Sequence, residues 1–285
     1  MTGCPLCGGP GEPQFHLHSY QIHRCLWCEA DFNACFVGGG ADGELFSRHY
    51  FEIQHKEAFT RRGEDYRLDP SCPVFARRLS QIEQAIGAGR VVDVGPGLGT
   101  FLRVARDRGW HVEGVELSAF ASEFIRRTHQ IEVFTGDLTA FAERTGDRFD
   151  LITFWDSIEH VAQPLEVLQA ARQLLRPGGY LVIATDNFDC LVADIGVALY
   201  RASGGRVRYP VERVYIDRNR TYFTERSLLT LLEKLGLRVV YSEKMEYPLG
   251  KIRTTLVERA ALATIYAAAR LTGRQAQLTL FAVAA

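Results

Sequence analysis

The alternation of apolar and amphipathic segments predicts an α/β fold for most of the chain. From Arg90 onward, short apolar runs recur between amphipathic stretches at the spacing of strand–helix units. The runs at 91–94 and 181–183 are almost continuously apolar, which is typical of parallel strands buried on both faces. The expected strands cover 90–94, 111–116, 131–134, 149–155 and 180–185.

Helical periodicity and capping signals define the segments between and after these strands. Pro164 lies in the first turn of one predicted helix, and Pro177 follows its end. Thr224 is the expected N-cap of a later helix. The expected helices cover about 74–86, 164–175, 224–235 and 251–270, and two further strands are expected at 237–242 and 277–283.

The length of 285 residues, at roughly 150 residues per domain, predicts about two domains. Residues 1–45 form an expected cysteine-rich module with a glycine-rich junction, and 46–89 form a helical cap segment. The main domain is expected to cover 90–285. Within it, 186–222 is too long for an ordinary connection, so this insertion is predicted to be a lid.

Four cysteines near the N-terminus form two Cys-x-x-Cys pairs, Cys4 with Cys7 and Cys25 with Cys28. Zn²⁺ prefers four tetrahedral ligands, and two such turns at this separation fit a four-thiolate site. The segment therefore resembles a zinc ribbon with a structural metal ion, and free or redox-active thiols are the alternative. The remaining cysteines, which are expected to be small buried residues, are Cys35, Cys72 and Cys190.

The charge of the chain disfavours bulk binding to nucleic acid. Thirty-three basic residues against 34 acidic residues give a net charge of −1. Residues 1–36 hold three acidic residues and one basic residue, and a zinc ion with four thiolates would add further negative charge. Such a ribbon would repel phosphates, which favours a structural role or a role as a substrate cap.

The chain starts without a cationic segment or an apolar run, and no stretch approaches 18 uncharged apolar residues. We therefore expect no secretory signal, no membrane span and a cytoplasmic location. The sequence does not predict an oligomeric state.

A glycine-rich turn follows the first predicted strand of the main domain. Glycine lets the backbone approach a ligand closely and adopt conformations that other residues disfavour. Glu116 ends the next strand, where such folds hold the two hydroxyls of a ribose, and Asp137 follows the third strand. The spacing Gly-x-Gly-x-Gly differs from the nicotinamide fingerprint Gly-x-Gly-x-x-Gly. The turn contains Asp93, Gly95, Pro96, Gly97 and Gly99.

These motifs resemble those of the class I S-adenosylmethionine (SAM)-dependent methyltransferases, in particular small-molecule enzymes related to the ubiquinone O-methyltransferases. The resemblance covers 73–285 and rests on five motifs in order, including the Leu-Leu-Arg-Pro-Gly-Gly-Tyr stretch at 174–180. It implies a Rossmann-like α/β fold with a seven-stranded, mostly parallel sheet and an antiparallel edge strand. A small zinc ribbon would precede this fold.

The resemblance also implies SAM as the cofactor and identifies the residues that bind it. Asp93 and the glycines would border the methionine part, and Glu116 would grip both ribose hydroxyls. Asp137 and Leu138 would contact adenine, and the motif at 154–160 would lie near the amino group. The implied cofactor-binding residues are Asp93, Gly95, Pro96, Gly97, Gly99, Glu116, Leu117, Asp137, Leu138, Trp155 and Asp156.

Methyl transfer needs an aligned acceptor and a group that removes the acceptor's proton. His160 and Glu159 are candidate catalytic residues, because histidine takes up protons near neutral pH. The spacing Asp156-x-x-Glu159-His160 also resembles the magnesium-binding acid cluster of the ubiquinone enzymes. Three interpretations stay open: a structural wall of the cofactor pocket, proton transfer by His160 and, least favoured, a Mg²⁺ site.

The insertion carries the information about the acceptor. Six arginines and two acidic residues between Arg201 and Arg220 give a local net charge of +4. Guanidinium groups suit carboxylates and phosphates, so we expect a small anionic acceptor, with a solvated lid face as the alternative. Tyr222 is the third candidate catalytic residue. It belongs to an aromatic group that could line a wall or anchor the lid: Tyr209, Tyr215, Tyr222 and Phe223.

The leading hypothesis is therefore a SAM-dependent O-methyltransferase that acts on a small sugar, natural-product or cell-envelope precursor. An RNA methyltransferase that uses the zinc ribbon and an inactive SAM-binding partner protein are the alternatives. The glycine spacing disfavours a nicotinamide oxidoreductase.

Overall fold

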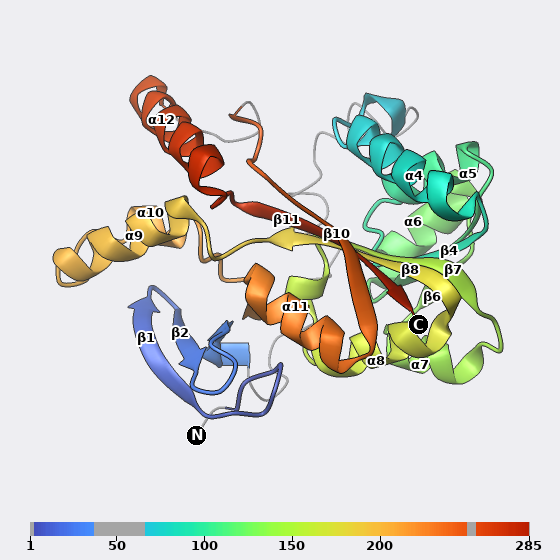
Figure 1. Cartoon of the computed structure of the whole chain (residues 1–285), viewed down its shortest axis with the longest axis horizontal. Coiled ribbons are helices and arrows are strands. Elements are labelled where there is room, and N and C mark those ends of the chain that lie inside the picture. The colour runs from blue at the N-terminus through green and yellow to red at the C-terminus, as the bar shows by residue number, and fades with distance from the viewer. Residues whose placement is uncertain (1–2, 37–65, 250–254, 285) are drawn as a thin grey trace.

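The computed structural model describes residues 3–36, 66–249 and 255–284. Its centre is a seven-stranded sheet in the order β10-β11-β8-β7-β4-β5-β6 (Figure 1). Strands β4 to β8 pair in parallel, whereas β11 runs antiparallel to both β8 and β10. The strands are β4 (Arg90–Val94), β5 (His111–Glu116), β6 (Val133–Thr135), β7 (Phe149–Trp155), β8 (Leu175–Asp186), β10 (Leu237–Met245) and β11 (Gln277–Ala284).

This topology confirms the predicted α/β fold, with the last two strands forming an antiparallel pair at one edge of the sheet. Most strand boundaries agree with the prediction to within a few residues. Strand β8 starts earlier than expected because Leu175 already pairs with Phe149, and regular pairing resumes at Tyr180 after an irregular segment. The Pro-Gly-Gly sequence that was expected only to end a helix is therefore part of an extended strand.

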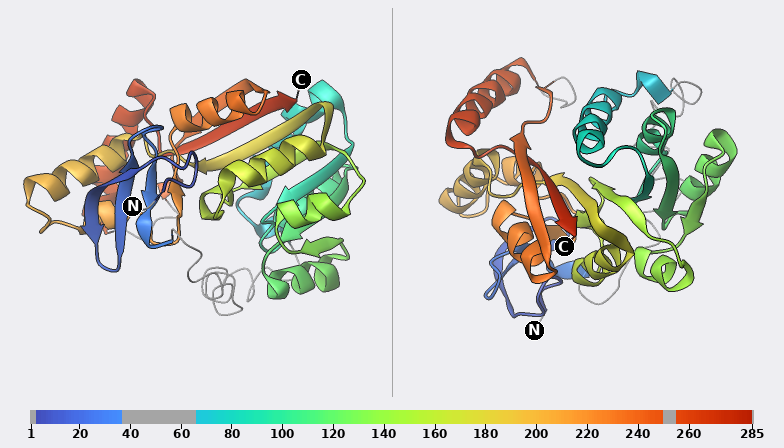
Figure 2. Two further views of the ribbon diagram at one scale, coloured as in Figure 1. Left: turned by 90° about the horizontal axis from the view of Figure 1, so that it is seen from below. Right: turned by 45° about the vertical axis from the view of Figure 1, so that its right-hand side comes forward.

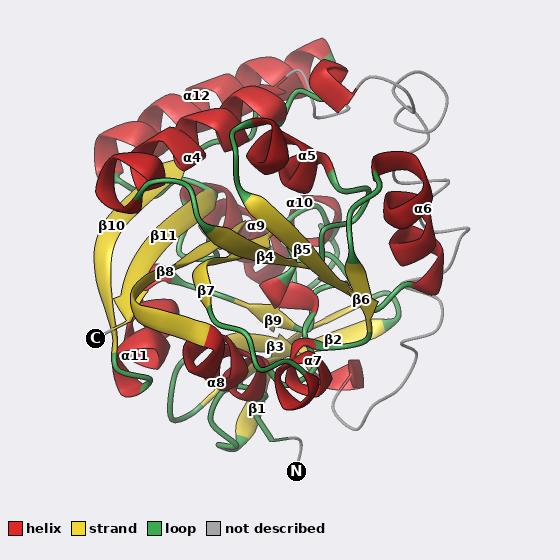
Figure 3. Cartoon of the chain, turned by 90° about the vertical axis from the view of Figure 1, so that its right-hand side faces the viewer, coloured by secondary structure: helices red, strands yellow, loops and turns green. Residues whose placement is uncertain are grey.

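Helices cover both faces of the sheet (Figure 3). Leu79, Phe101 and Ile125 pack with Val91 on one face, whereas Phe141 and Leu168 belong to the core of the other face. Val92 faces this second core, so successive residues of β4 are buried on opposite sides. The covering helices are α4 (Cys72–Ile86), α5 (Thr100–Asp107), α6 (Ala119–His129), α7 (Leu138–Arg144), α8 (Pro164–Leu174) and α11 (Glu225–Lys234).

The N-terminal segment forms a second, smaller sheet that includes a strand of the insertion. Strands β1 (Gly11–Leu17), β2 (Tyr20–Cys25) and β3 (Asp31–Asn33) are antiparallel, and β3 pairs with β9 (Thr221–Tyr222). Figure 2 shows this sheet lying against the insertion rather than apart from it. The ribbon and the insertion therefore share one hydrogen-bonded structure.

The remaining elements lie around the site and at the far end of the insertion. Helices α9 (Leu191–Ala202) and α10 (Tyr209–Glu212) form most of the insertion, and α12 (Leu256–Thr272) packs against α9. The described ranges also contain the short 3₁₀ helices η1 (Ala34–Phe36), η2 (Tyr66–Leu68) and η3 (Ile158–His160).

Parts of the predicted organisation lie outside the described residues. These are the glycine-rich junction after residue 36, the cap segment up to residue 65 and the start of the helix expected near 251. Within the described ranges, no helix is both long and apolar enough to cross a membrane.

Candidate functional site

A cavity of about 670 Å³ opens beyond the carboxyl ends of the parallel strands. Residues that follow β4, β5, β6 and β7 line it, together with Phe75 of α4. A cavity of this size suits a small organic ligand. Open α/β sheets bind their ligands at this edge, so the position agrees with the site expected from the strand ends.

The glycine turn after β4 adopts a backbone conformation that requires glycine. Gly95, Gly97 and Gly99 have φ angles of 73°, 57° and 81°, in the left-handed region. A Cβ on Gly95 would lie 2.8 Å from the Cβ of Ser157, whereas a Cβ on Gly97 would meet nothing within 4 Å. Gly95, Pro96 and Gly97 line the cavity, and Gly99 closes the turn by donating to the Pro96 carbonyl at 2.8 Å.

Two buried acids stand beside this turn. The Glu116 carboxylate accepts hydrogen bonds from the Ser118 N–H at 2.8 Å and the Gly97 N–H at 3.3 Å. Asp93 accepts a hydrogen bond from the Thr153 hydroxyl at 2.7 Å. Burial raises the pKa of each acid to about 7, and the charge of Glu116 adds to the shift of Asp93. A ligand that donates hydrogen bonds here would stabilise the ionised carboxylates.

Asp137, Leu138 and Leu117 line the part of the cavity nearest β5 and β6. Asp137 caps α7, because its carboxylate accepts from the Ala140 N–H at 2.8 Å and from the Thr139 hydroxyl at 2.6 Å. These bonds lower the pKa of Asp137, so it stays ionised at neutral pH. Leu117 is half exposed and offers an apolar surface.

Trp155 and Asp156 form the wall at the end of β7. The Trp155 ring packs against Phe75 and Phe101, with ring centres 5.1 and 5.3 Å apart. Its indole N–H is buried and has no hydrogen-bond partner within the described ranges. Asp156 has a φ of 48°, a left-handed conformation that aspartate tolerates better than most residues. Such backbone strain often accompanies a binding site.

Three further wall residues precede or begin α4, and the sequence motifs did not indicate them: Asp69, Ser71 and Phe75. Asp69 joins this segment to α5 by accepting a hydrogen bond from the Thr100 hydroxyl at 3.1 Å. The apolar periodicity of α4 predicted the helix but could not predict which of its residues reaches the cavity.

The two candidate catalytic residues of η3 occupy different environments. His160 lines the cavity, and its Nδ1 donates to the Arg218 carbonyl at 3.1 Å. Burial and the nearby Arg218 charge lower the pKa of His160 despite this bond. Glu159 is buried outside the cavity wall and accepts from the Thr185 hydroxyl at 2.8 Å. Burial, Asp156 and Asp186 raise its pKa well above the ordinary range, which disfavours Glu159 as a base that contacts substrate.

Tyr222 also lies away from the cavity. Its side chain is fully buried, its hydroxyl donates to the Ile216 carbonyl at 2.8 Å, and its ring packs against Phe188 and Tyr215. The Tyr222 side chain, expected as a catalytic residue, therefore lies outside the described cavity wall, in an apolar cluster shared by the insertion and the ribbon.

The six arginines of the insertion do not gather at the cavity. Of the six, only Arg220 lines the cavity, and it is 4% exposed. Arg201 instead donates to Gln14 of the ribbon, and Arg213 lies over the ring of Tyr209. Arg220 is also the one lysine or arginine in the described wall of the cavity.

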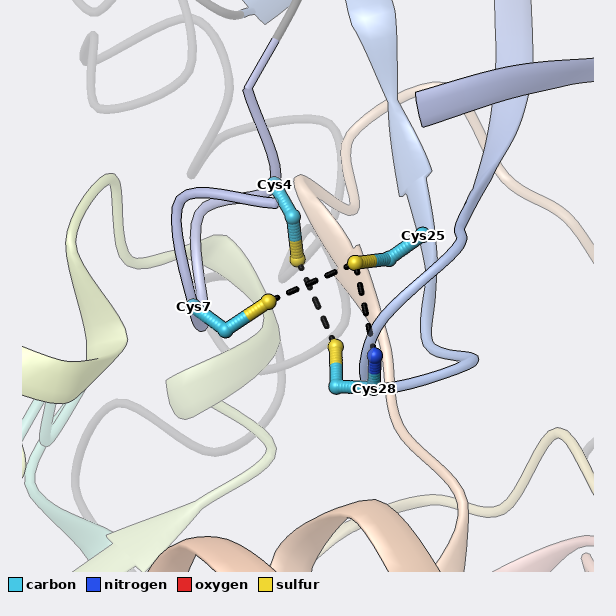
Figure 4. Close-up of side chains that lie close together, drawn as sticks. All are labelled: Cys4, Cys7, Cys25 and Cys28. Atoms are coloured by element: carbon cyan, nitrogen blue, oxygen red, sulfur yellow. Dashed lines mark hydrogen bonds between the residues drawn. The ribbon is translucent and has the colours of Figure 1, made fainter. Parts of the chain in front are cut away.

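The four cysteines of the ribbon converge as the spacing predicted (Figure 4). Cys4 and Cys28 Sγ atoms lie 3.6 Å apart, Cys7 and Cys25 Sγ atoms lie 3.3 Å apart, and all four lie within 4.8 Å of one another. A tetrahedron with metal–sulfur bonds of roughly 2.3 Å has edges of about 3.8 Å, so the thiols fit Zn²⁺.

The two Cys-x-x-Cys turns, here called the first knuckle (4–7) and the second knuckle (25–28), have matching backbone geometry. The Leu6 N–H donates to Cys4 Sγ and the Trp27 N–H donates to Cys25 Sγ, each at 3.4 Å. Among the described residues, the four thiols are the one group of at least three Cys, His, Asp or Glu side chains close enough to hold a metal ion. The acids near His160 do not converge in this way. Cys35, expected to be buried, is exposed at the end of the ribbon.

The chain belongs to a family of methyltransferases, since the family described as "Methyltransferase domain" matches residues 66–242, more than half of the chain. The predicted enzyme class is therefore confirmed at the level of the family. The chain is 32% identical over 146 residues to the ubiquinone biosynthesis O-methyltransferase of Pseudomonas aeruginosa strain UCBPP-PA14, covering 48% of this chain and 62% of that protein. The corresponding protein of Aeromonas salmonicida is 34% identical over 157 residues, covering 53% and 66%. The chain thus spans less than two thirds of the first of these relatives.

Solved structures support the fold. A SAM-dependent methyltransferase from Archaeoglobus fulgidus matches with a TM-score of 0.55 and 21% identity, covering 81% of this chain and 99% of that one. Magnesium protoporphyrin IX methyltransferase from Synechocystis PCC 6803, solved with bound SAH, matches with a TM-score of 0.56 and 13% identity, covering 85% and 97%. At these identities the similarity establishes the fold alone.

Proposed function

We propose that this protein transfers a methyl group from SAM to a small anionic acceptor. The observation that carries the proposal is the cavity beside the glycine turn, where the Glu116 carboxylate is held by two backbone N–H groups. Membership of the methyltransferase family supports the same reaction. When bound, SAM supplies an activated methyl group on its sulfonium.

The residues present fit this cofactor. Glu116 has carboxylate oxygens at the cavity wall that can accept from ribose hydroxyls, and Gly97 leaves space for close approach. Asp137 and Leu138 would hold the adenine, and Asp93 would lie near the methionine part. Trp155 and Asp156 would complete the wall near the amino group.

His160 is the proposed base on the acceptor side. A carbonyl can only accept, so the bond to Arg218 places the proton on Nδ1 and leaves Nε2 of the neutral ring unprotonated. The lowered pKa keeps the ring neutral at physiological pH. Nε2 would take the acceptor's hydroxyl proton as the oxygen–methyl bond forms and the sulfur–methyl bond breaks.

Arg220 is the proposed anchor for the acceptor's negative charge. It is the one guanidinium in the described cavity wall, in a wall that otherwise carries several acids. A guanidinium fork matches a carboxylate or a phosphate in geometry and charge. Of the six arginines in the insertion, Arg220 alone is therefore proposed to bind the acceptor's anionic group. This role favours O-methylation of a hydroxylated acid.

Zn²⁺ is the proposed metal of the ribbon, where Cys4, Cys7, Cys25 and Cys28 would hold it. A hydrogen bond with Cys28 and burial raise the pKa of Cys4, so the thiolates need a cation to form together. A closed four-thiolate site leaves no position for substrate, which supports a structural role. Among the described residues, Asp156 and Glu159 do not belong to a group of side chains that converges closely enough to hold Mg²⁺.

Methyl transfer to paired acceptors tests the proposal. The wild-type chain, purified with zinc, is incubated with methyl-labelled SAM and with hydroxylated carboxylic acids or their amides. We expect label in the acids at least tenfold faster than in the amides, and Arg220→Gln should remove this preference. Arg206→Gln, which changes an exposed arginine of the same insertion, is the matched control. Transfer only to RNA, or equal rates with amides, would contradict the proposed acceptor class.

A further inference from the structure

A short segment of the insertion joins the zinc ribbon to the cavity. We define the strap as residues 218–220. At one side, the Arg218 carbonyl accepts from His160 Nδ1 at 3.1 Å and the Arg220 N–H donates to the Glu159 carbonyl at 2.8 Å. At the other side, the Arg220 carbonyl accepts from the Asn33 N–H of β3 at 3.0 Å. The strap is thus hydrogen-bonded to the ribbon and to η3 at once.

The ribbon holds the strap by contacts on both sides of it. Before the strap, the Asn33 side chain donates to the Asp217 carbonyl at 3.1 Å, and the Tyr215 hydroxyl donates to Asp31 at 2.9 Å. After the strap, Thr221 pairs with Phe32 as β9 extends the ribbon sheet. Strand β3 provides all of these partners.

Strand β3 is in turn fixed by the second zinc knuckle. It begins three residues after Cys28, and the Cys25 N–H donates to the Ala30 carbonyl at 2.9 Å. The Trp27 N–H donates to Cys25 Sγ, so hydrogen bonds and the short covalent segment 30–33 together link the knuckle to the strap. The apolar side chains of the ribbon are buried in clusters shared with the insertion and the sheet, and a zinc ion held by the four thiolates would fix the path of the turn that leads into β3.

We propose that the metal-loaded ribbon is a positioning element for the acceptor side of the cavity. The ribbon fixes the position of the strap. The strap in turn orients His160 through Nδ1 and places Arg220 in the cavity wall. Neither the ribbon nor the metal contacts the substrate. The cofactor side stands on β4, β5 and β6 of the large sheet. Loss of zinc therefore disorders the acceptor side while SAM binding persists. This inference rests on the proposed function for the roles of His160 and Arg220.

Hydrogen–deuterium exchange of the full chain tests the coupling without an acceptor. Cys28→Ser is compared with the zinc-loaded wild type, and Cys35→Ser, which changes an exposed cysteine outside the cluster, is the matched control. We expect exchange at Asn33 and Arg220 to rise at least tenfold in Cys28→Ser and to stay unchanged in the control. The affinity for SAH, measured on the same samples, should change less than about threefold.

Two results would overturn the inference. If the ribbon opens but the Arg220 amide keeps its protection, the strap is held without the ribbon. If Cys28→Ser loses SAH binding together with protection across β4 and β5, the metal supports the whole fold rather than one side of the cavity. Failure of the wild type to bind SAH would instead contradict the proposed function. The exchange data would still decide whether the ribbon positions the strap.

Tyr215→Phe tests the same coupling with the metal in place. This variant removes the hydroxyl that donates to Asp31 but keeps the ring that packs against Phe188 and Tyr222. We expect one zinc per chain, unchanged exchange in the knuckles and a several-fold rise in exchange at Arg220. An unchanged strap in this variant and in Cys28→Ser would exclude a positioning role for the ribbon.

Discussion

At the scale of single residues, two buried carboxylates set the electrostatics of the cavity. Asp93 and Glu116 are almost inaccessible to solvent, yet both stand at the wall where a ligand would bind. Burial makes ionisation costly, which is why the pKa of each rises to about 7. A ribose that donates two hydrogen bonds would favour the ionised form of Glu116, so binding and ionisation are linked.

SAM binding should therefore strengthen as the pH rises through 7. With a pKa of about 7, the ionised fraction of Glu116 increases about tenfold from pH 6 to pH 8. We expect the dissociation constant for SAM to fall by up to about tenfold over this range, measured by titration at each pH. In Glu116→Gln the affinity should be weak, and its pH dependence should shrink to the part that Asp93 contributes. A slope of undiminished size in this variant would assign the titration to Asp93 or another group.

The proposed base gives a second pH signature, now in kcat. His160 is active when neutral, and its pKa lies below the ordinary value, so activity should fall only as the pH drops below about 6.5. His160→Gln should lower kcat by about 100-fold or more and remove this acid limb, with SAM saturating so that Glu116 does not contribute. A variant that keeps both the rate and the limb would exclude His160 as the base.

The residues that could be predicted from the sequence are those whose role follows from local backbone geometry. Glycines at a strand end and an acid at the end of the next strand define positions relative to the sheet, and Gly95, Gly97 and Glu116 lie there. Arg220 could not be distinguished from the other five arginines, because the path of the insertion decides which one reaches the cavity. The same path decides that the Tyr222 side chain lies outside the described cavity wall.

At the scale of elements, α11 and α12 both begin with a capping box but differ in how much of each helix is buried. Thr224 and Thr255 each form a capping box. Helix α11 buries Leu228 and Leu232 in the core, whereas the buried residues of α12 are Tyr266 and Ala269 in its last turns. The first turn of α12 is therefore stabilised by its cap and by the polar interactions of Glu258 with Tyr209 and Arg213, without burial of apolar side chains in that turn.

Removal of the two caps should have unequal effects on global stability. Thr224→Ala should lower the free energy of unfolding by about 1 kcal/mol, because the start of α11 is coupled to the core. Thr255→Ala should fray the first turn of α12 and change the global value by less than about 0.3 kcal/mol. Urea denaturation measures both, and equal losses would show that the start of α12 is coupled to the core as well.

The sequence predicted the elements of the sheet better than those of the insertion. Continuous apolar runs and helix caps define β4, β7, α8 and α11 locally. The pairing of β9 with the ribbon joins residues about 190 positions apart, at Phe32 and Thr221, and no local pattern encodes it. The irregular start of β8 likewise depends on its neighbour, because Leu175 is in a strand only through its pairing with Phe149.

At the scale of the whole molecule, the ribbon and the large sheet differ in what stabilises them. The large sheet has a hydrophobic core on each face. The ribbon adds Leu6 and Phe32 to one of these cores, packs Leu17 and Ile22 into a third cluster shared with the insertion, and brings its four cysteines together at one end. We therefore expect the ribbon to depend on the proposed Zn²⁺ as well as on apolar burial, and the large sheet to depend on apolar burial alone.

Unfolding should consequently occur in two steps that respond to different ligands. Zinc release, followed with a colorimetric chelator, should precede loss of helical circular dichroism as denaturant increases. SAM should raise the midpoint of the second step only, because it binds the sheet side of the cavity. A single step in which zinc release and sheet unfolding coincide would contradict this division.

Calorimetric titration of the zinc-loaded chain with SAM and, separately, with NADH is the most direct test of the assignment of the cavity to SAM. We expect micromolar binding of SAM and none of NADH. Glu116→Ala should weaken SAM binding by about 100-fold, since it removes charged hydrogen-bond acceptors worth roughly 3 kcal/mol. The matched control is Glu113→Ala on the same strand, whose carboxylate pairs with Arg90 instead, and it should bind SAM as the wild type does. Absence of SAM binding, or preference for NADH, would show that the cavity is not a SAM site.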